Sequence, residues 1–540
     1  MMKFRYLPLL AAFVLAASPL LAQVSYESIL GSDGDPANWP TYSGSYHGQH
    51  YREIDQINRQ NVADLQLSWV YQGSSTNTWQ STPIVVDGVM YVTEGPDNVV
   101  ALDAVTGREF WKHEHKLPAR INVCCGKINR GVALLGDLVY MGTLDGYLKA
   151  LDAKTGRLVW EKKIVDNDEG YALAMAPLVV KDKIIIGPAG GEYGIRGFLD
   201  AYDAKTGERV WRFNTIPGPG EKGHETWEND AWKTGGGSAW VTGSYDPELN
   251  LLYWGVGNPS PDWNPEVRPG DNLYTDSVIA LNPDTGELQW HFQFTPNDEW
   301  DYDSVQVPVL ADMEYQGRQR KLMLWGNRNA FFYVLDRTDG TFLLGKPFAK
   351  QTWAKGLDDK GRPIKAPGMS PSEAGTEVFP SVQGATNWYA PAYSPRTKLF
   401  YLTAWVDYWG LFYTGEPVVY TPGNRYDGSA VARIYPDAME EKEPGTGAIR
   451  ALDPLSGEAR WEFSSLGVSE SGLLATSSDL LFSGSMEGHF FAIDATNGEL
   501  LWRTQLGGRV ANSPITYMAN GRQQVTVASG DSLFTFRLKQ

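Results

Sequence analysis

Seven copies of one eleven-residue pattern recur along this chain of 540 residues. Each copy has Asp or Asn at its third position and Gly four residues later, and six of the seven end in Trp. An Asp or Asn side chain can hydrogen-bond nearby backbone and Gly readily takes a positive φ, so each copy predicts a tight turn between two strands. The closing Trp offers a large face for packing on a neighbouring unit. The copies are residues 101–111, 150–160, 201–211, 280–290, 334–344, 451–461 and 492–502.

The spacing of these copies predicts the fold class. Consecutive copies start between 41 and 117 residues apart, which gives each copy room for about one four-stranded sheet. The widest interval follows 334–344, and we expect a degenerate copy within it, at 393–402 (YSPRTKLFYL). Eight radially arranged sheets then account for the chain without several domains. The prediction is an all-β fold: one eight-bladed β-propeller over residues 23–540, with Trp-docking repeats and inserted loops near 212–279 and 345–430.

One inserted segment, residues 404–426, is rich in aromatic side chains. Long loops in a compact fold are usually functional, so we expect this segment to wall a substrate pocket; the alternative is that it only covers the edge of a blade. Its aromatic residues are Trp405, Tyr408, Trp409, Phe412, Tyr413, Tyr420 and Tyr426.

Residues 1–22 have the features of a secretory signal peptide. Lys3 and Arg5 form a short basic start, residues 7–21 are almost wholly apolar, and Ala22 is a small residue at a plausible cleavage site. The alternative is an uncleaved membrane anchor, although the apolar run is short for that role. A cleaved signal predicts export to the periplasm, an oxidising compartment, and a mature protein without a membrane span.

The formal net charge is −17, and it becomes −19 once the two cations Lys3 and Arg5 leave with the signal peptide. A surface this acidic disfavours nucleic acid and anionic lipid as partners. It suits a basic protein partner instead.

Cys124 and Cys125 are the two cysteines of the chain, and they are adjacent. Neighbouring Cα atoms lie about 3.8 Å apart across a trans peptide, so a bridge between these cysteines would form a tight ring and close almost no loop. Such a ring is of little use as a cross-link, which suggests a surface built to lie against another molecule. The alternative is a pair of reduced, buried cysteines that act as small apolar residues.

Oxygen ligands also occur outside the repeats, where turn formation does not require them. Glu192 lies among glycines in GGEYGIRG, Asn258 lies in YWGVGNPSPDW, and Asp301 and Asp303 stand two residues apart in DEWDYDS (298–304). If this last segment is a strand, its two aspartates share one face. Together these groups suit a hard cation. Singly, each is also consistent with a solvated surface acid or a turn residue.

The repeats, the cysteine pair and these acids together resemble the quinoprotein alcohol dehydrogenases, the methanol and ethanol dehydrogenase family that uses pyrroloquinoline quinone (PQQ). The resemblance covers essentially the whole mature chain and includes the motifs CCGKINRG, GGGSAWVTGSYDP, WGNRNAFFYVLDR and GATNWYAP. It implies an eight-bladed propeller with PQQ in an axial chamber. One face of the quinone would lie on a ring formed by Cys124 and Cys125, and the other face would stack on Trp240.

The resemblance also implies roles for individual residues. Asp301 matches the catalytic base, which takes the proton of the alcohol hydroxyl while hydride passes to the quinone and an aldehyde forms. Arg328 matches a cation beside the quinone oxygens, and Arg130 matches a residue that binds a quinone carboxylate. Ser238 and Asn387 match polar contacts to PQQ. The metal ligands that the resemblance implies are Glu192, Asn258 and Asp301, with Asp303 as an additional acid.

Asp303 bears on the identity of the metal. It is similar to the extra acid of the lanthanide-dependent branch of this family, and a trivalent ion prefers one more anionic oxygen than calcium does. We therefore expect a lanthanide rather than Ca²⁺; the alternative is that Asp303 points to solvent or bonds nearby backbone and that the site holds calcium. Three positions depart from the family pattern and affect the expected PQQ contacts: Gln80, where Glu is frequent, Ala174, where Thr is common, and Glu470, where Trp often stands.

The chain has no CxxCH haem-attachment motif, so we expect its electrons to pass to a separate soluble c-type cytochrome. The expected substrates are small primary alcohols, and both a monomer and a homodimer stay open. Two rival interpretations are a non-catalytic periplasmic propeller scaffold, which would need neither the cysteine pair nor the acids, and a quinoprotein dehydrogenase for sugars or polyols.

Overall fold

The computed structural model describes residues 24–75, 79–414, 419–428, 433–434, 445–465 and 467–539. The predicted signal peptide lies outside the described residues, and so does part of the aromatic insertion.

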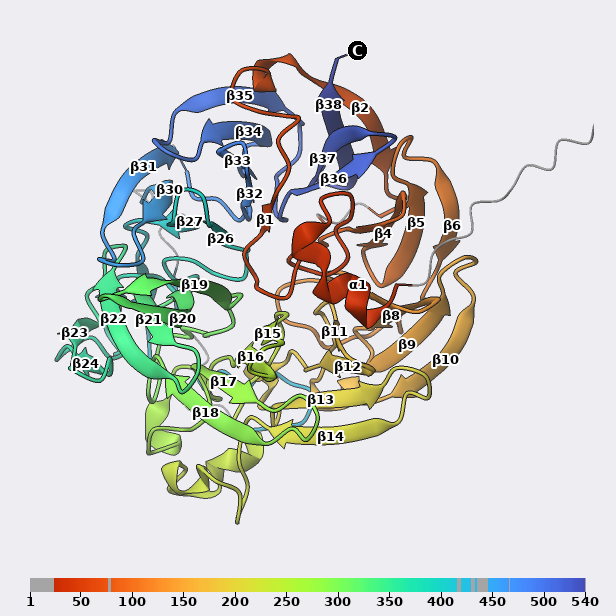
Figure 1. The fold of residues 1–540 in the computed structure, drawn as a ribbon. Coiled ribbons are helices and arrows are strands. Elements are labelled where there is room, and N and C mark those ends of the chain that lie inside the picture. The colour runs from red at the N-terminus through yellow and green to blue at the C-terminus, as the bar shows by residue number, and fades with distance from the viewer. Residues whose placement is uncertain are drawn as a thin grey trace, which may run out of the picture.

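Eight sheets, the blades, stand radially around a central axis (Figure 1). Each has four antiparallel strands, and the sheet of blade 7 has a fifth, parallel strand added. Blades 1 to 4 are β3–β6 (Ile84–Val86, Val89–Glu94, Asn98–Asp103, Glu109–His113), β7–β10 (Ala133–Leu135, Leu138–Gly142, Tyr147–Asp152, Leu158–Lys163), β11–β14 (Leu178–Val180, Lys183–Ile186, Phe198–Asp203, Arg209–Asn214) and β15–β18 (Ser244–Asp246, Leu251–Gly255, Ser277–Leu281, Leu288–Gln293). Blades 5 to 8 are β19–β22 (Val309–Tyr315, Arg318–Gly326, Phe331–Asp336, Thr341–Pro347), β26, β27, β30 and β31 (Ala392–Ser394, Leu399–Trp405, Gly447–Leu452, Ala459–Ser465), β32–β35 (Leu474–Thr476, Leu480–Gly484, His489–Asp494, Leu500–Gln505) and β36–β38 with β2 (Ile515–Ala519, Arg522–Ser529, Ser532–Leu538, Leu65–Gln72). The predicted all-β, eight-bladed propeller is confirmed.

Helices in the described chain are short. The helix α1 (Tyr26–Leu30) lies on the face of the propeller seen in Figure 1, near the strand β1 (Tyr51–Arg52), which pairs parallel with β32. The 3₁₀ helices are Ser32–Gly34, Val62–Asp64, Asn167–Glu169, Gly191–Tyr193, His224–Thr226, Asp230–Thr234 and Pro265–Val267. Within the described residues, no helix combines the length and the apolar character needed to cross a bilayer.

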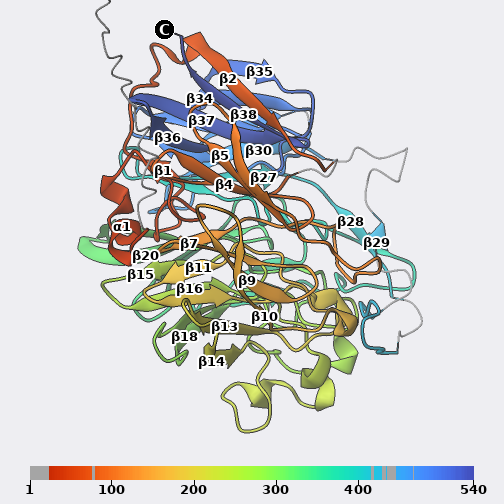
Figure 2. The same ribbon diagram turned by 90° about the vertical axis from the view of Figure 1, so that its right-hand side faces the viewer.

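The long insertions add loops and small sheets to blades 3 to 6. Residues 215–243 connect blades 3 and 4, and residues 256–276 lie between β16 and β17. The later insertions contain a two-stranded sheet and a three-stranded sheet, and Figure 2 shows part of the latter on the side of the molecule opposite α1. Their strands are β23 (Ala354–Leu357), β24 (Pro363–Lys365), β25 (Thr376–Val378), β28 (Gly410–Phe412) and β29 (Arg433–Ile434).

Blade 8 closes the ring by joining segments from both ends of the chain. Its outer strand β2 pairs antiparallel with β38, from Leu65 opposite Leu538 to Gln72 opposite Ser532. The third and fourth strands of blade 8, β38 and β2, are therefore not joined by a hairpin. Since each repeat forms that hairpin turn, blade 8 contains no repeat. The predicted degenerate copy at 393–402 is wrong, because those residues form the first hairpin of blade 6, β26–β27, and blade 6 already carries the copy at 451–461.

Each repeat forms the turn from the third to the fourth strand of its blade. In blade 1, Asp103 Oδ1 accepts hydrogen bonds from the backbone N–H groups of Val105 at 2.8 Å and Thr106 at 3.2 Å. Gly107 completes the turn with φ of +71°. The Asp and Gly of the pattern therefore act in the turn as their chemistry predicts.

The Trp of five repeats packs on the Gly of the next blade, and Trp69 of β2 makes the same contact between blades 8 and 1. Trp111 of blade 1 covers Gly156 of blade 2 so closely that a Cβ there would clash with the indole, and its Nε1 donates to the Ala153 carbonyl at 3.0 Å. Gly is thus required both for its positive φ and for the space it leaves. The equivalent pairs are Trp69–Gly107, Trp160–Gly207, Trp211–Gly286, Trp290–Gly340 and Trp461–Gly498, while Leu344 and Lys346 face Gly457.

Gly156→Ala should destabilise the propeller more than Gly88→Ala. Both glycines have positive φ, +69° and +78°, but a Cβ at Gly88 would meet open space. Gly88→Ala should therefore cost about 1–2 kcal/mol for the left-handed backbone alone. Gly156→Ala must also displace the Trp111 indole, so we expect a loss of about 3–5 kcal/mol. Equilibrium urea unfolding measures both values, and equal losses would contradict the role of indole docking.

Candidate active site

A cavity of about 340 Å³ lies on the axis of the propeller. Its lining residues come from all eight connections between successive blades, from Gln80 before blade 1 to Arg509 before blade 8, and from loops within blades, such as those of Glu192 and Arg328. A site built in this way brings together side chains that are far apart in sequence. The volume is in the range of pockets that hold small ligands.

Every predicted site residue except Asn258 lines this cavity. The three positions that depart from the family pattern line it as well. The predicted residues found there are Cys124, Cys125, Arg130, Glu192, Ser238, Trp240, Asp301, Asp303, Arg328 and Asn387, together with Gln80, Ala174 and Glu470.

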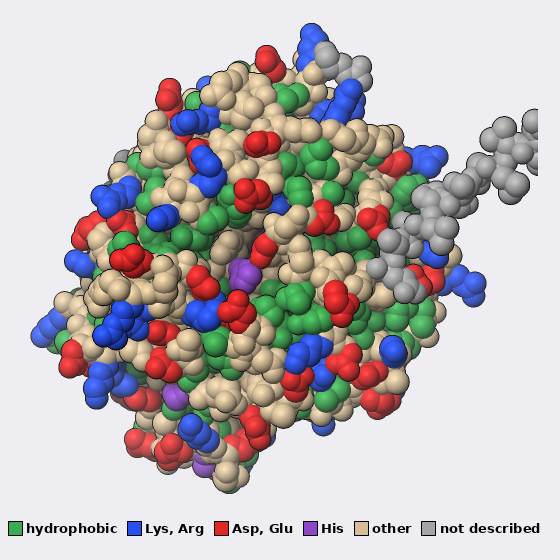
Figure 3. Space-filling view, viewed as in Figure 1, with side chains coloured by type: hydrophobic (Ala, Val, Ile, Leu, Met, Phe, Trp, Pro, Cys, Tyr) green, Lys and Arg blue, Asp and Glu red, His purple; other side chains and the backbone are tan. Residues whose placement is uncertain are grey.

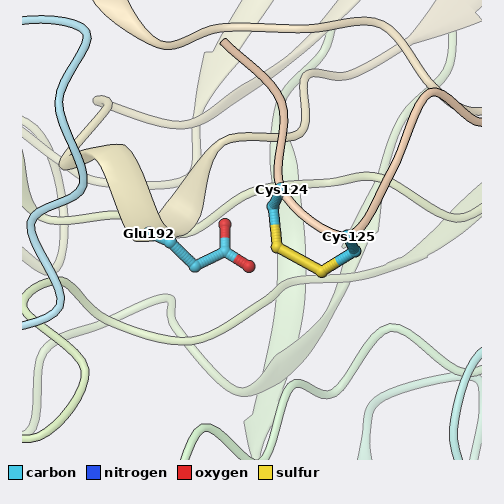
Figure 4. A group of neighbouring side chains, drawn as sticks. All are labelled: Cys124, Cys125 and Glu192. Atoms are coloured by element: carbon cyan, nitrogen blue, oxygen red, sulfur yellow. A yellow bond between two sulfur atoms is a disulfide. The ribbon is translucent and has the colours of Figure 1, made fainter. Parts of the chain in front are cut away.

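Cys124 and Cys125 form a disulfide, with Cα atoms 3.8 Å apart. The alternative of two reduced, buried cysteines is wrong, since Cys124 is half-buried and Cys125 is exposed. The loop that carries them lies between β6 and β7 and uses a positive φ of +61° at Cys125 and of +104° at Gly126. The disulfide faces the cavity and the Glu192 carboxylate (Figure 4).

Trp240 and Arg130 form another part of the wall. The guanidinium carbon of Arg130 lies 4.7 Å from the centre of the Trp240 ring and 5.0 Å from that of Trp388. Arg130 Nη2 donates to Gln80 Oε1 at 2.8 Å. Burial lowers the pKa of Arg130 to about 10, so its guanidinium stays charged at neutral pH. The cavity therefore offers an indole, a disulfide and a buried cation to a flat anion.

Asp301 and Asp303 meet at Arg328. The Arg328 Nη2 lies 3.1 Å from Asp301 Oδ2, and its Nη1 lies 2.6 Å from Asp303 Oδ2. Arg328 Nε is fixed by a hydrogen bond of 2.9 Å to the Val382 carbonyl. All three charged side chains are buried.

The segment that carries these aspartates is a loop between β18 and β19, so the condition of a strand, on which a shared face depended, is not met. Asp301 has φ of +63°. Asp298 holds the loop in shape, because its two carboxylate oxygens accept hydrogen bonds from the backbone of Trp300 at 3.1 Å and Tyr302 at 2.8 Å. The two aspartates reach one guanidinium through this turn rather than through alternation along a strand.

Glu192 and Asn258 lie on neighbouring backbone segments. Glu192 belongs to a 3₁₀ turn between Gly190 and Gly194, and one of its oxygens lies within 4.8 Å of both sulfurs of the disulfide. Asn258 packs against Gly191 from behind, with its Nδ2 donating to Asp262 Oδ1 at 2.9 Å. The carboxylates of Glu192, Asp301 and Asp303 do not form a group within 4.8 Å of one another, since the aspartates turn towards Arg328.

The buried acids at this end of the cavity fit a cation. Burial raises the pKa of Asp301 well above its usual range, with Arg328 opposing the rise and Asp303 adding to it. Burial, with a contribution from Asp303, also raises the pKa of Glu192. Behind them, both carboxylate oxygens of Asp276 are buried without a hydrogen-bond partner among the described residues. Carboxylates that lose hydration next to one another are stabilised by a metal ion with oxygen ligands.

Among the cavity residues that the sequence did not predict, three carry a charge or an indole. Trp388 follows Asn387 and stacks on Arg130; Arg425 comes from the segment 419–428; Arg509 pairs with Glu470. The side chains of Arg425 and Arg509 belong to no repeat or motif, so no sequence signal singled them out. Trp388 lies within the motif GATNWYAP, next to the predicted Asn387.

The aromatic residues of the 404–426 insertion do not line the cavity, and the insertion contributes Arg425 to its wall instead. Trp405 and Tyr408 pack in a buried cluster with Trp388. Tyr420 and Tyr426 pack beside Gly194, and the Tyr426 N–H donates to the Glu192 carbonyl at 2.6 Å. They support the loops that carry the site.

Comparisons with known proteins agree with this arrangement. Residues 39–348 match the PQQ family described as glucose/ethanol/alcohol dehydrogenase, β-propeller domain, and residues 445–538 match a family described as outer membrane protein assembly factor BamB. The chain is 41% identical to quinoprotein alcohol dehydrogenase PedH of Pseudomonas putida, over 97% of this chain and 92% of that protein. It is 38% identical to the quinohemoprotein alcohol dehydrogenase of Comamonas testosteroni, over 95% of this chain and 75% of that protein.

Solved structures show the same relationship. Quinohemoprotein alcohol dehydrogenase ADHIIG of Pseudomonas putida superposes with a TM-score of 0.91 and 36% identity, over 96% of this chain and 83% of that one. A europium-containing methanol dehydrogenase superposes with a TM-score of 0.86 and 31% identity, over 95% of this chain and all of that one (100%). With an axial cavity lined by a vicinal disulfide, an indole and paired acids, the chain belongs to the quinoprotein alcohol dehydrogenases, the PQQ-dependent oxidoreductases that act on alcohols.

Proposed function

We propose that the protein oxidises primary alcohols to aldehydes in the periplasm, with PQQ and one metal ion. The observation that carries the proposal is the convergence of the disulfide, Trp240 and the Asp301–Arg328–Asp303 cluster on one axial cavity. Bound PQQ supplies the two-electron acceptor that the side chains of this protein lack.

The residues of the cavity fit that cofactor by their chemistry. The disulfide and the Trp240 indole are the two flat surfaces against which a quinone would lie. Arg130 supplies a buried positive charge for a carboxylate, and Ser238 and Asn387 are buried polar side chains on the same wall. Asn387 is fixed by its Nδ2, which donates to the Gln383 carbonyl at 2.9 Å.

Asp301 is the proposed base. Its Oδ2 is held by Arg328 Nη2, and its other oxygen is available to accept the hydroxyl proton of the alcohol. Because the side chain is buried, bulk water does not compete for that oxygen. Arg328 is fixed in turn by the Val382 carbonyl, so the orientation of the base is set by the backbone of the next blade connection.

The proposed metal ligands are Glu192, Asn258 and Asp301, with Asp303 as an additional donor, and we propose a lanthanide rather than Ca²⁺. The similarity to a europium-containing methanol dehydrogenase supports the lanthanide. Asp303 lines the cavity with its Oδ2 on Arg328. Its Oδ1 accepts from the backbone N–H of Asn258 at 2.8 Å, which is the backbone bond that the calcium alternative expects. This contact ties two proposed ligands together and keeps one more anionic group beside the metal.

The electrons are proposed to pass to a separate soluble c-type cytochrome after export directed by residues 1–22. The net charge of −17 favours a basic partner as that acceptor. On the face seen in Figure 3, acidic and basic side chains are interspersed rather than gathered in one patch. That face therefore shows no single docking site for such a partner.

Reconstitution of the purified protein tests the activity. With PQQ and either Ca²⁺ or La³⁺, it should reduce an artificial dye when given methanol, ethanol or benzyl alcohol, and glucose and glycerol should be poor substrates. No dye reduction with any alcohol would contradict the proposal, and faster reduction with glucose would favour the sugar dehydrogenase alternative.

Asp301→Asn should lower kcat by roughly 10²- to 10⁴-fold, because the base is lost. PQQ should still bind, since the disulfide, Trp240 and Arg130 are unchanged. Dye-linked turnover and equilibrium dialysis of PQQ measure the two effects separately. Asp312→Asn, at an exposed position on β19, serves as the control. Full turnover in Asp301→Asn would exclude this residue as the base.

Asp303→Ala should affect the two metals differently. It removes an anionic donor, so La³⁺-supported turnover should fall by about 10-fold or more, whereas Ca²⁺-supported turnover should be kept or improved. Titration of each metal into the PQQ-loaded variant provides the measurement. An equal loss with both ions would mean that Asp303 acts only by orienting Arg328 and the Asn258 backbone.

A further inference from the structure

A second ion pair, between Glu470 and Arg509, lines the same cavity and takes no part in the proposed chemistry. Glu470 belongs to the connection between blades 6 and 7, and Arg509 to the connection between blades 7 and 8. Arg509 Nη2 lies 3.5 Å from Glu470 Oε2. The two residues therefore meet across adjacent blades at the wall of the site.

This pairing leaves polar atoms without hydrogen bonds. Glu470 Oε2 and Arg509 Nε are buried, and neither has a hydrogen-bond partner among the residues that the structure describes. Arg130 Nε, on the same cavity, is in the same condition. Each buried polar atom left in this state costs about 1–3 kcal/mol, so they are rare in folded proteins. Two of these atoms, the Nε atoms of Arg130 and Arg509, are donors, so they indicate a ligand in the cavity that accepts hydrogen bonds.

The charges on this part of the wall select an anion. Burial lowers the pKa of Arg130, and the nearby Glu470 carboxylate opposes that change, which places Glu470 within electrostatic reach of Arg130. Two guanidinium groups thus stand near one carboxylate. By itself, Glu470 would repel an anionic ligand; paired with Arg509, it adds no net charge and restricts the motion of the guanidinium.

We propose that Arg509 is a second guanidinium that binds a carboxylate of PQQ, and that Glu470 positions it through their ion pair. This inference rests on the proposed function, since PQQ is the carboxylate-bearing ligand of the cavity. The Nη2 of Arg130 already donates a hydrogen bond to Gln80, so it is not free to bind the cofactor. A planar guanidinium at Arg509 adds the bidentate geometry that carboxylates prefer.

Equilibrium dialysis of PQQ against the full-length, metal-loaded protein tests the proposal without any turnover. Arg509→Gln should raise the Kd of PQQ by roughly 10- to 100-fold, the value of a hydrogen bond to a charged group. Arg509→Lys should fall between the wild type and Arg509→Gln, because it keeps the charge and loses the fork. The matched control is Arg450→Gln: Arg450 pairs with Glu462 at 2.6 Å away from the cavity, and its Kd should equal that of the wild type.

Two further arms separate recognition of a carboxylate from a general loss of structure. The trimethyl ester of PQQ carries no carboxylate charge, so Arg509→Gln should leave its Kd unchanged. In the wild-type background, Glu470→Gln should raise the Kd of PQQ severalfold, because the ion pair that orients Arg509 is lost. In the Arg509→Gln background, the same substitution should lower the Kd, because it removes a carboxylate that has no cationic partner and repels the cofactor.

The outcomes distinguish this inference from the proposed function. If the wild type does not bind PQQ, the proposed function fails. If the wild type binds PQQ and folded Arg509→Gln binds it equally well, the role of Arg509 is overturned. If Arg509→Gln does not fold by circular dichroism, Arg509→Lys and Glu470→Gln decide: unchanged Kd values in both overturn the inference, and raised values support it.

Discussion

The packing of an indole on a glycine of the next blade is the interaction on which the rest of this structure depends. Trp111 on Gly156 is one instance, and the same contact recurs at most blade junctions. It fixes the angle between neighbouring sheets, and β2 on β38 then completes the circle. Because all eight blade connections meet at the axis, a rigid ring can hold side chains from distant parts of the chain to within the tolerance that catalysis needs.

The axial site concentrates buried charge that an isolated loop would not sustain. Arg328 joins two aspartates and a backbone carbonyl, and Asp298 braces the turn that delivers those aspartates. Burial makes the ionised acids costly, and a bound cation offsets that cost. The scaffold itself does not determine the chemistry: the C-terminal blades match a family named for outer membrane protein assembly, whereas Glu192, Asp301 and Asp303 lie outside that match.

The repeats predicted seven blades from local turn chemistry, and the interval of 117 residues between the copies at 334–344 and 451–461 predicted the eighth. The predicted copy at 393–402 is a hairpin of blade 6. No repeat marks blade 8, because its strands come from both ends of the chain. The motifs identified most of the charged and aromatic cavity residues. They did not show which of these residues contact one another, because the contacting residues are far apart in the sequence. Asp298 escaped notice because it binds backbone, and Arg509 because its partner, Glu470, is on another blade connection. The sequence predicted Asn258 as a metal ligand but could not show that its side chain packs against Gly191 and does not line the cavity.

A crystal structure of the protein with PQQ and La³⁺ tests the central claim most directly. We expect the quinone between the Cys124–Cys125 disulfide and Trp240, and one ion about 2.3–2.6 Å from oxygens of Glu192, Asn258 and Asp301. For this, Glu192 and Asp301 must turn towards each other from their present positions beside the disulfide and Arg328. An ion bound by only one of these three residues, or PQQ bound outside the axial cavity, would contradict the account.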